Sequence, residues 1–347
     1  MENDKISGKA KMLIAVAALG YFVDVYDLIL FSVVRNPSLM SLGLKGDDLL
    51  NQGLSLMNIQ MGGMLIGGIL WGIYGDKKGR KSVLFGSILL YSAANALNGL
   101  VTDMNTYAIL RFIAGIGLAG ELGAGITLVN ETLPPSKRGI GTLIIAGVGA
   151  AGAVFAPIIA GLSSDPEWWR SCYFIGGGMG LALLLLRLGT FESSMYTEMD
   201  DKVERGNFFQ LFSNGATFKK YLYCILMGLP IWYIIGILVF SAPEISKIIG
   251  IDGKISGGDA IMFCYIGLAT GDFAAGALSQ WFKSRGKAVL TYLFIGLFLF
   301  HLFYFFVELG ELANIFYILF KTILSALLAL ILYVIFYMLF FSIPERK

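Results

Sequence analysis

Residues 72–81 read GIYGDKKGRK and form a short, strongly charged turn between two long apolar runs. The charged side chains of this turn are one acid followed by four bases: Asp76, Lys77, Lys78, Arg80 and Lys81. Gly72 and Gly79 allow two helices to approach closely and the connection between them to be tight. A loop on the cytoplasmic side of a membrane explains the bases, but it does not explain the spacing of the glycines and the aspartate.

Apolar runs extend in both directions from this turn. The 347 residues are 56% hydrophobic and 14% charged, with a mean hydropathy of +0.74, which excludes a soluble enzyme, a disordered chain and a disulfide-rich secreted scaffold. A helix needs about 20 apolar residues to cross the hydrocarbon of a bilayer. Ten runs have roughly this length, at residues 12–34, 54–75, 82–102, 105–130, 140–163, 170–190, 221–243, 259–281, 288–308 and 320–343. The sequence therefore predicts an all-α polytopic membrane protein.

The charge and cysteine content give no sign of a nucleic-acid, metal or cofactor partner. The chain has 26 Lys plus Arg against 24 Asp plus Glu, a net charge of +2, which is too small to gather a polyanion. Cys172, Cys224 and Cys264 form no CxxC or His-containing cluster, so we expect neither a metal site nor a cofactor. No G-x-x-x-x-G-K-[ST] loop occurs, which argues against an ATP-driven pump, and we do not expect an enzyme.

Lys and Arg residues are distributed unevenly between the two sides of the predicted spans. With a cytoplasmic N-terminus, eighteen of them fall on the inner side and five on the outer side. Basic loops stay in the cytoplasm, and an even number of spans returns the C-terminus to the same side. We therefore expect both termini in the cytoplasm and location in a bacterial inner membrane.

The longest polar interval inside the chain separates six predicted spans from four. The sequence thus predicts an N-terminal six-helix bundle at 1–190, a cytoplasmic linker at 191–220 and a C-terminal bundle at 221–347. The last apolar run, 314–342, has 29 residues, which suffices for one long or tilted helix but not for two crossings. We therefore expect the C-terminal bundle to be incomplete.

Two motifs carry a resemblance to a known family. GIYGDKKGRK matches the pattern G-x-x-x-D-[RK]-x-G-[RK]-[RK] at every defined position, and RFIAGIGLAGELGAG at 111–125 is similar to R-F-x-x-G-x-G-x-G-G, with Ala119 at one glycine position. On these motifs the chain resembles the major facilitator superfamily. The resemblance implies two bundles of six helices that rock around a central cavity. It also implies that the charged turn is a cytoplasmic gate, with the motif residues Gly72, Asp76, Lys77, Gly79, Arg80 and Lys81.

The first predicted span contains two acids in an otherwise apolar helix. Its segment GYFVDVYDL, residues 20–28, is similar to the G-[FY]-F-x-D-x-Y-D pattern of phosphate and related metabolite proton symporters. Inside a bilayer a charged carboxylate is costly unless it is paired, hydrated or protonated, and Asp24 and Asp27 share one helix face. We interpret both as proton-coupling residues. The alternative is a structural role, in which neutral acids hold helices together by hydrogen bonds.

Depth along the spans relates these acids to the fourth span. At about 1.5 Å per residue, Asp27 and Arg111 lie at nearly one level and can form a pair. Glu121 lies about 5 Å inward of the midplane with no obvious cationic partner, so it should exchange protons. The resemblance likewise implies a coupling role for an acid at this position. Arg111 is either a structural charge partner or a binding group for an anionic substrate.

The C-terminal half offers fewer candidates. Trp232 and Tyr233 follow Pro230 in the seventh run, and a proline kink with polar-tipped aromatics suits the lining of a substrate cavity. Packing explains the same aromatics equally well. Asp272 in the eighth run is a further candidate for the cavity.

Together these features predict a secondary active transporter, in which proton entry drives symport of a small polar or anionic metabolite. The expected partners are that small-molecule substrate, protons and the lipid bilayer, and we expect a monomer. Two alternatives remain open. One is a proton-coupled efflux antiporter that uses the same carboxylates, and the other is a transport-inactive membrane scaffold or fragment, which the short second half favours.

Overall fold

The computed structural model describes residues 7–189, 205–248 and 256–282, together with Ser284, Lys287, Leu290, Thr291, Phe294, Ile295 and Phe298. The regular structure of these residues is helical. The chain divides into two compact units, Met1–Phe208 (unit 1) and Phe209–Lys347 (unit 2), and each is described by itself. The boundary lies within residues 191–220, while the division into two bundles and a linker at those residues stays a prediction.

Unit 1 is built of long helices that follow the apolar runs. Their bounds are α1 Gly8–Ser41, α2 Asp48–Lys78, α3 Arg80–Asn98, α4 Met104–Leu118, α5 Glu121–Thr132, α6 Pro135–Ala160 and α7 Trp168–Leu186. Five of the six predicted N-terminal runs each fall on one helix. The run at 105–130 falls on both α4 and α5, because the helix is interrupted at Ala119 and Gly120.

Five helical stretches of the described chain are long and apolar enough to cross a membrane: Ala10–Ser41, Asp48–Lys78, Met104–Thr132, Lys137–Ala160 and Trp168–Leu186. The helix α3, predicted as a span from run 82–102, is less apolar than these. It carries buried polar side chains that lower its hydropathy: Ser87, Ser92, Asn95 and Asn98. With 19 residues it is roughly 28 Å long, close to the thickness of the hydrocarbon core.

Residues at the helix ends shape the turns of unit 1. The Asp103 carboxylate accepts a hydrogen bond from the Thr106 N–H at 2.9 Å and so caps the start of α4. Gly79 is the single residue between α2 and α3, and its φ of +90° lies in a region that favours glycine. The charged turn is therefore a direct reversal from one helix into the next.

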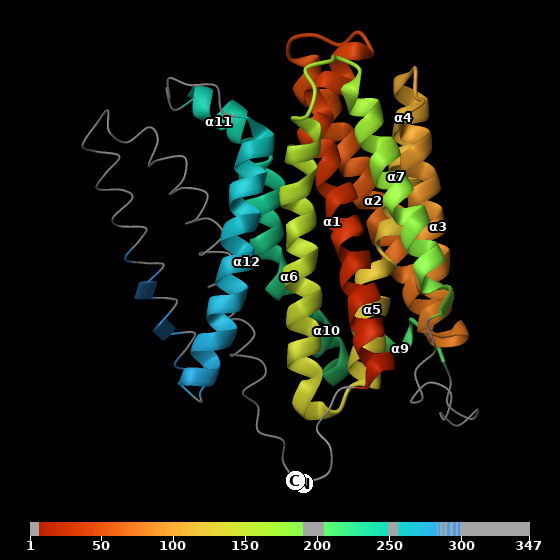
Figure 1. Ribbon diagram of the computed structural model, residues 1–347, viewed down its shortest axis with the longest axis vertical. Helices are drawn as coiled ribbons and strands as arrows, with labels where there is room; N and C mark the ends of the chain where they lie inside the picture. Colours follow the sequence, from red (N-terminus) through yellow and green to blue (C-terminus); the bar gives the residue numbers. More distant parts are fainter. Residues whose placement is uncertain are drawn as a thin grey trace. The chain divides into compact units, whose positions relative to one another are not determined.

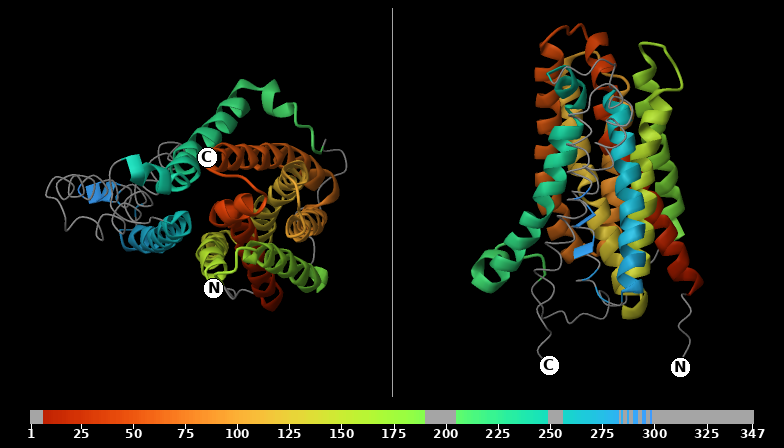
Figure 2. Two further views of the ribbon diagram at one scale, coloured as in Figure 1. Left: turned by 90° about the horizontal axis from the view of Figure 1, so that it is seen from above. Right: turned by 90° about the vertical axis from the view of Figure 1, so that its left-hand side faces the viewer.

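The helix α1 contacts α2, α5, α6 and α7, and Figures 1 and 2 show it in red beside α6 and α7 in yellow and green. Its first half contributes to a buried apolar cluster with α3 and α5, whose members include Leu13, Ile14, Leu84 and Leu128. Lipid tails are as apolar as these side chains, so close packing, rather than removal from water, holds such a bundle together.

Glycines bring α2 and α4 into close contact. A Cβ at Gly63 would overlap the carbonyl of Phe112, and a Cβ at Gly115 would overlap the carbonyl of Gln60. A side chain at either position would force the two helices apart, so this approach depends on glycine. The contact places the second half of α2 beside the end of α4.

The described helices of unit 2 are α9 Gln210–Ser213, α10 Gly215–Tyr233, α11 Ala242–Ile248 and α12 Gly257–Trp281. A π-helical segment, Ile234–Val239, follows α10 directly. The predicted run 221–243 falls on α10, this segment and the start of α11, and the run 259–281 falls on α12. The run 320–343 lies outside the described residues, as does the run 288–308 apart from the single residues named above.

Candidate functional site

Five charged side chains from the predicted spans are buried inside unit 1 and form the candidate site, which we call the buried charge cluster. They come from α1, α4, α5 and the residue that follows α7: Asp24, Asp27, Arg111, Glu121 and Arg187. None is more than 5% exposed. Charges in the interior of a membrane protein are costly unless they have partners, so their contacts point to the function of this region.

Glu121 is paired with Arg187. Arg187 Nη1 donates to Glu121 Oε2 at 2.7 Å and Nη2 donates to Oε1, so the guanidinium contacts both carboxylate oxygens. Nη1 also donates to the backbone carbonyl of Leu84 on α3 at 3.0 Å. On α1, Gly20 leaves room for the pair, because a Cβ there would overlap Arg187 Nη2 and Glu121 Oε1. The prediction that Glu121 lacks a cationic partner is wrong, because α7 brings Arg187 to its level.

Asp24 lies beside this ion pair. Glu121 and Arg187 are within electrostatic range of its carboxylate, and the side chain of Tyr91 on α3 is a neighbouring hydrogen-bonding group. Among the described residues, neither oxygen of Asp24 meets the distance and angle of a hydrogen bond, and the neighbouring Tyr91 hydroxyl does not either. Asp24 is therefore a buried acid next to a cation that is already engaged by another carboxylate.

Asp27 and Arg111 do not form the ion pair that their depth predicts. Arg111 Nη2 donates to Oε1 of Gln60, and Nη1 donates to the Tyr173 hydroxyl at 3.4 Å. Its guanidinium lies over the Phe31 ring, 4.6 Å from the centroid. Asp27 is near the Asn95 side chain of α3 and within electrostatic range of Arg111, yet in the described part of the chain neither of its oxygens meets the distance and angle of a hydrogen bond. Equal depth does not ensure contact, because the helix also fixes the direction of each side chain.

Neutral groups surround Arg111 on the side of Tyr173. The Tyr173 and Tyr107 hydroxyls lie 2.7 Å apart, and the Tyr107 hydroxyl donates to Ser38 Oγ at 3.4 Å. Arg111 is thus held by an amide, a hydroxyl and aromatic rings rather than by an acid in direct contact. Whether its role is structural or anion-binding stays a prediction.

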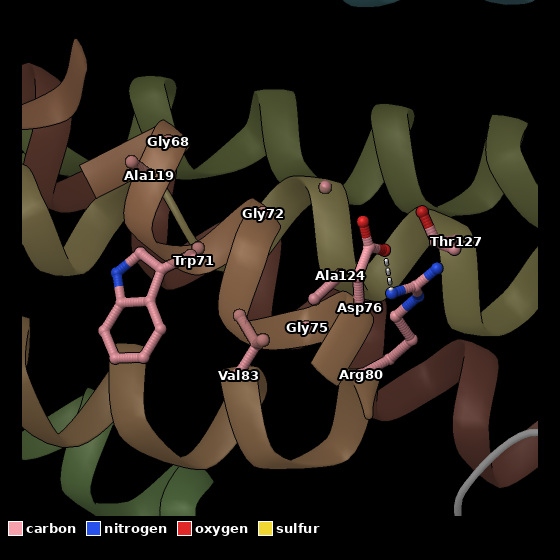
Figure 3. Close-up of a pocket in the computed structure, with 12 residues that line it drawn as sticks. Gly68, Trp71, Gly72, Gly75, Asp76, Arg80, Val83, Ala119, Ala124 and Thr127 are labelled. Carbon is pink, nitrogen blue, oxygen red and sulfur yellow. Dashed lines mark hydrogen bonds and ion pairs between the residues drawn. The ribbon is translucent and has the colours of Figure 1, made fainter. Parts of the chain in front are cut away.

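The charged turn joins the ends of three helices of unit 1. Arg80, the first residue of α3, pairs with Asp76 of α2 at 2.8 Å and with Glu131 of α5 at 3.6 Å. Figure 3 shows the Asp76 carboxylate directed at the Arg80 guanidinium, with a dashed line between them. Asp76 therefore has a partner within its own unit, and the gating role of the motif stays a prediction.

The remaining motif residues lie around the same turn. Lys77 occupies the last turn of α2, where a positive charge suits the helix dipole, and Lys81 lies over the Phe85 ring at 5.7 Å. Gly72 has open space where a Cβ would stand and lines a cavity of about 260 Å³. Residues of α2, of the start of α3, of the α4–α5 interruption and of α5 line this cavity, and Figure 3 shows Trp71 and Ala119 among them.

The cavity candidates of the C-terminal half are placed only in part. Trp232 and Tyr233 end α10 with exposures of 49% and 56%, and the π-helical segment begins directly after them. Asp272 lies on α12, but its side chain is outside the described residues. In the described residues, no group of three or more His, Cys, Asp or Glu side chains could hold a metal ion.

Comparison with known proteins supplies the family. The family model described as Major Facilitator Superfamily matches residues 17–346, nearly the whole chain. The chain belongs to the major facilitator superfamily. It is therefore an integral, multi-pass membrane protein of a transporter family, and the predicted all-α facilitator fold is confirmed.

Bacterial relatives of this facilitator are named as transporters. A putative niacin/nicotinamide transporter of Bacillus subtilis is 28% identical over 192 residues, which cover 55% of this chain and 47% of the relative. The sialic acid transporter of Escherichia coli is 26% identical over 225 residues, which cover 64% and 54%. The chain thus spans about half the length of the curated relatives it matches.

Solved facilitator structures share the fold at low sequence identity. The D-xylose-proton symporter has a TM-score of 0.68 at 17% identity, with 94% of this chain and 80% of that chain covered. The human organic anion transporter MFSD10 has a TM-score of 0.68 at 14% identity, with 95% and 86% covered. At these identities the likeness concerns the fold.

The side chains of this facilitator site that sequence reasoning missed include Gln60, Tyr91 and Arg187. A signal for Arg187 exists, because it lies about 10 Å inward of the middle of run 170–190, within about 5 Å of the level of Glu121. Gln60 and Tyr91 give no comparable signal, since an uncharged residue in an apolar run has many structural explanations.

Proposed function

We propose that this facilitator carries a small polar or anionic metabolite across the membrane by alternating access and that proton entry drives its uptake. The names of the relatives support the substrate class: niacin or nicotinamide, sialic acid and gentisate are small polar molecules. Sialic acid and gentisate carry a carboxylate at neutral pH. A structural neighbour named as a D-xylose-proton symporter supports the coupling ion.

The observation that carries the coupling is the position of Asp24 beside the Glu121–Arg187 pair. Three acids share the buried charge cluster with two arginines, so at least one carboxylate has no cation of its own. Arg187 contacts Glu121, whereas the oxygens of Asp24 meet no hydrogen-bond geometry among the described residues and have only the neutral Tyr91 hydroxyl as a neighbouring donor. An ionised carboxylate in that environment is costly. We therefore infer that Asp24 carries a proton when unit 1 has this arrangement.

Loss of this proton leaves two ionised carboxylates, Asp24 and Glu121, next to the single guanidinium of Arg187. An ionised Asp24 competes with Glu121 for the same guanidinium, which α7 holds between α1 and α5. A change of partner at this meeting point favours a different arrangement of the helices, so proton binding and helix movement are linked. In this proposal Glu121 holds Arg187, and Asp24 takes up and releases the transported proton. Asp27 is a second buried acid, next to the positive charge of Arg111.

A transport assay tests the proposal. The purified chain is first screened for thermal stabilisation by phosphate, sugars, organic acids, amino acids and niacin, because a solute that binds the folded state raises its melting temperature. A stabilising solute is then added outside proteoliposomes that contain a pH-sensitive dye. Symport acidifies the interior. An alkaline shift would instead identify the efflux antiporter, and no shift with any stabilising solute would favour the transport-inactive scaffold.

We also propose that both termini are cytoplasmic in a bacterial inner membrane. The start of α1 and the charged turn lie at the same end of unit 1, because Ala10 and Val83 share one buried cluster. The bases of the turn would then face the cytoplasm, as the distribution of Lys and Arg requires. Labelling of single cysteines at residues 8 and 78 with an impermeant reagent, in intact and in opened cells, tests this orientation.

A further inference from the structure

The fourth predicted span is interrupted directly before Glu121. The helix α4 ends at Leu118, and α5 begins at Glu121. In a continuous α-helix the Gly120 N–H would donate to the Ile116 carbonyl, four residues back. Here it donates to the Gly117 carbonyl at 3.2 Å, a tighter turn that releases the Ile116 carbonyl.

A tryptophan from another helix donates a hydrogen bond to the released carbonyl. Trp71 Nε1 on α2 donates to the Ile116 carbonyl oxygen at 2.7 Å. Inside a bilayer a carbonyl that has lost its helical partner is costly unless another donor takes its place. The indole N–H therefore compensates for the interruption, and it does so from outside the interrupted span.

The indole ring is seated closely at this point. A Cβ at Gly120 would stand 2.8 Å from Trp71 Cγ, and a Cβ at Gly86 of α3 would stand 2.8 Å from Trp71 Cη2. The ring also meets Tyr74 edge to face, with the centroids 6.0 Å apart. Figure 3 shows Trp71 in the cavity wall with Ala119, the other residue of the interruption. Two glycines thus make room for an indole that holds one backbone carbonyl.

We propose that Trp71 is a positioning residue, which keeps the fourth span interrupted and thereby sets the direction from which Glu121 meets Arg187. Glu121 is the first residue of α5, so its side-chain direction depends on the backbone conformation at residues 119 and 120. Without the indole N–H, the Gly120 N–H is the donor best placed to satisfy Ile116, and that exchange turns α5 relative to α4 and moves Glu121. The relevance of this positioning to transport rests on the proposed function, whereas the positioning of Glu121 by Trp71 does not depend on it.

A double-mutant cycle in the full chain tests the inference. W71F keeps an aromatic ring and removes the N–H, and the melting temperature of the purified protein is measured for wild type, W71F, E121Q and the double variant. If Trp71 positions Glu121, E121Q lowers the melting temperature in the W71F background by about half, or less, of the shift it causes in wild type. A residue that merely fills space would leave the E121Q shift unchanged, and that result overturns the inference.

The chain offers a matched control in Trp168. Its Nε1 donates to the Ile159 carbonyl at 2.8 Å near the end of α6, the same kind of bond away from the cluster. The E121Q shift should be the same in W168F as in wild type, and a reduction equal to that in W71F overturns the inference. If W71F does not fold, G86A replaces it, because the added methyl displaces the ring from its seat, and the same reduction is expected.

Uptake measurements distinguish a failure of this inference from a failure of the proposed function. If the proposed coupling holds, W71F shifts the pH profile of uptake while W168F leaves it unchanged. If D24N still accumulates substrate in response to a pH gradient, the proposed coupling fails. The melting-temperature cycle then still decides whether Trp71 positions Glu121.

Discussion

Glu121 at the start of α5 and Arg187 directly after α7 form an ion pair inside unit 1, with side chains that are 1% and 0% exposed. The guanidinium contacts both carboxylate oxygens and, in addition, the Leu84 carbonyl of α3. Three helices therefore meet at one cation. A buried pair of this kind is most sensitive to the loss of one partner, because the other charge then remains in a medium that solvates it poorly.

Removal of either charge should destabilise the protein strongly. We expect Glu121→Gln and Arg187→Gln each to lower the free energy of unfolding by about 3–5 kcal/mol. The double variant should lose less than the sum of both, since it leaves no uncompensated charge. Thermal unfolding in detergent measures these effects.

The exposed pair of Glu167 and Arg170 provides the control for this prediction. Their atoms lie 2.7 Å apart with side-chain exposures of 51% and 25%, so Glu167→Gln should cost no more than about 1 kcal/mol. Equal melting temperatures for Glu121→Gln and Glu167→Gln would contradict the importance of the buried pair.

Asp24→Asn should uncouple transport without weakening the fold. Asparagine resembles a protonated aspartate in size and polarity, so the arrangement with neutral Asp24 is retained while the titratable proton is lost. We expect accumulation driven by a pH gradient to fall to background, and exchange of labelled for unlabelled substrate to continue. Asp259→Asn, the same change at an exposed position in unit 2, should leave both activities unaltered. Normal accumulation by Asp24→Asn would remove Asp24 from the coupling mechanism.

Gly20→Ala should disturb the ion pair from the side of α1. Its Cβ would overlap Arg187 Nη2 and Glu121 Oε1, and overpacking of a tight interior costs about 1–3 kcal/mol. Gly62→Ala on α2 is the matched control, because nothing lies within 4 Å of its Cβ position. There we expect a gain of roughly 0.5–1 kcal/mol from the better helix propensity of alanine. Opposite signs of the two changes in unfolding free energy support the prediction, and a stabilising Gly20→Ala would refute it.

Asp76→Asn should change the gate more than the fold. Asp76 is half exposed and pairs with Arg80 four residues away, so the loss of its charge should cost at most about 1 kcal/mol of stability. If the motif gates the cytoplasmic side, the population moves toward the inward-open form. Labelling of single cysteines then rises on the cytoplasmic side and falls on the opposite side. Lys78→Gln in the same turn should not have this effect, and an identical labelling pattern in both variants would exclude a gating role for Asp76.

The start of α4 should respond to acid. The backbone N–H and the hydroxyl of Thr106 donate to the Asp103 carboxylate at 2.9 and 2.7 Å, and these bonds hold the pKa of the Asp103 carboxyl below its usual range. The cap therefore stabilises α4 fully above the pKa of the unfolded state and is lost as the pH falls through the lower, folded-state pKa. Hydrogen exchange at Thr106, corrected for intrinsic rates, should accelerate over that range. Asp103→Ser caps the helix without titrating there, so its exchange should lack this pH dependence.

The composition of local segments was enough to place most helices of unit 1. Inside a bilayer a helix satisfies nearly all of its backbone groups within the same segment, so a continuous apolar run is itself the helix signal. The spacing in GIYGDKKGRK likewise predicted a tight connection within residues 72–81, and the structure places the reversal at Gly79. Local reading failed at the interruption of the fourth span, because the run 105–130 was predicted as one continuous helix. That interruption depends on Trp71, 45 residues before Ile116.

The position of each charged residue along its predicted span indicated which charges lie inside the bundle. It did not indicate which of them are partners. Asp27 and Arg111 share a depth and do not pair, whereas Glu121 pairs with Arg187, 66 residues later in the chain. Depth follows from a rise of about 1.5 Å per residue along one helix. Contact also requires the rotation of each helix about its axis, and packing sets that rotation through positions such as Gly20, where α1 leaves room for two side chains from other helices. Pairing is therefore a property of several helices together, which no single segment of the sequence contains.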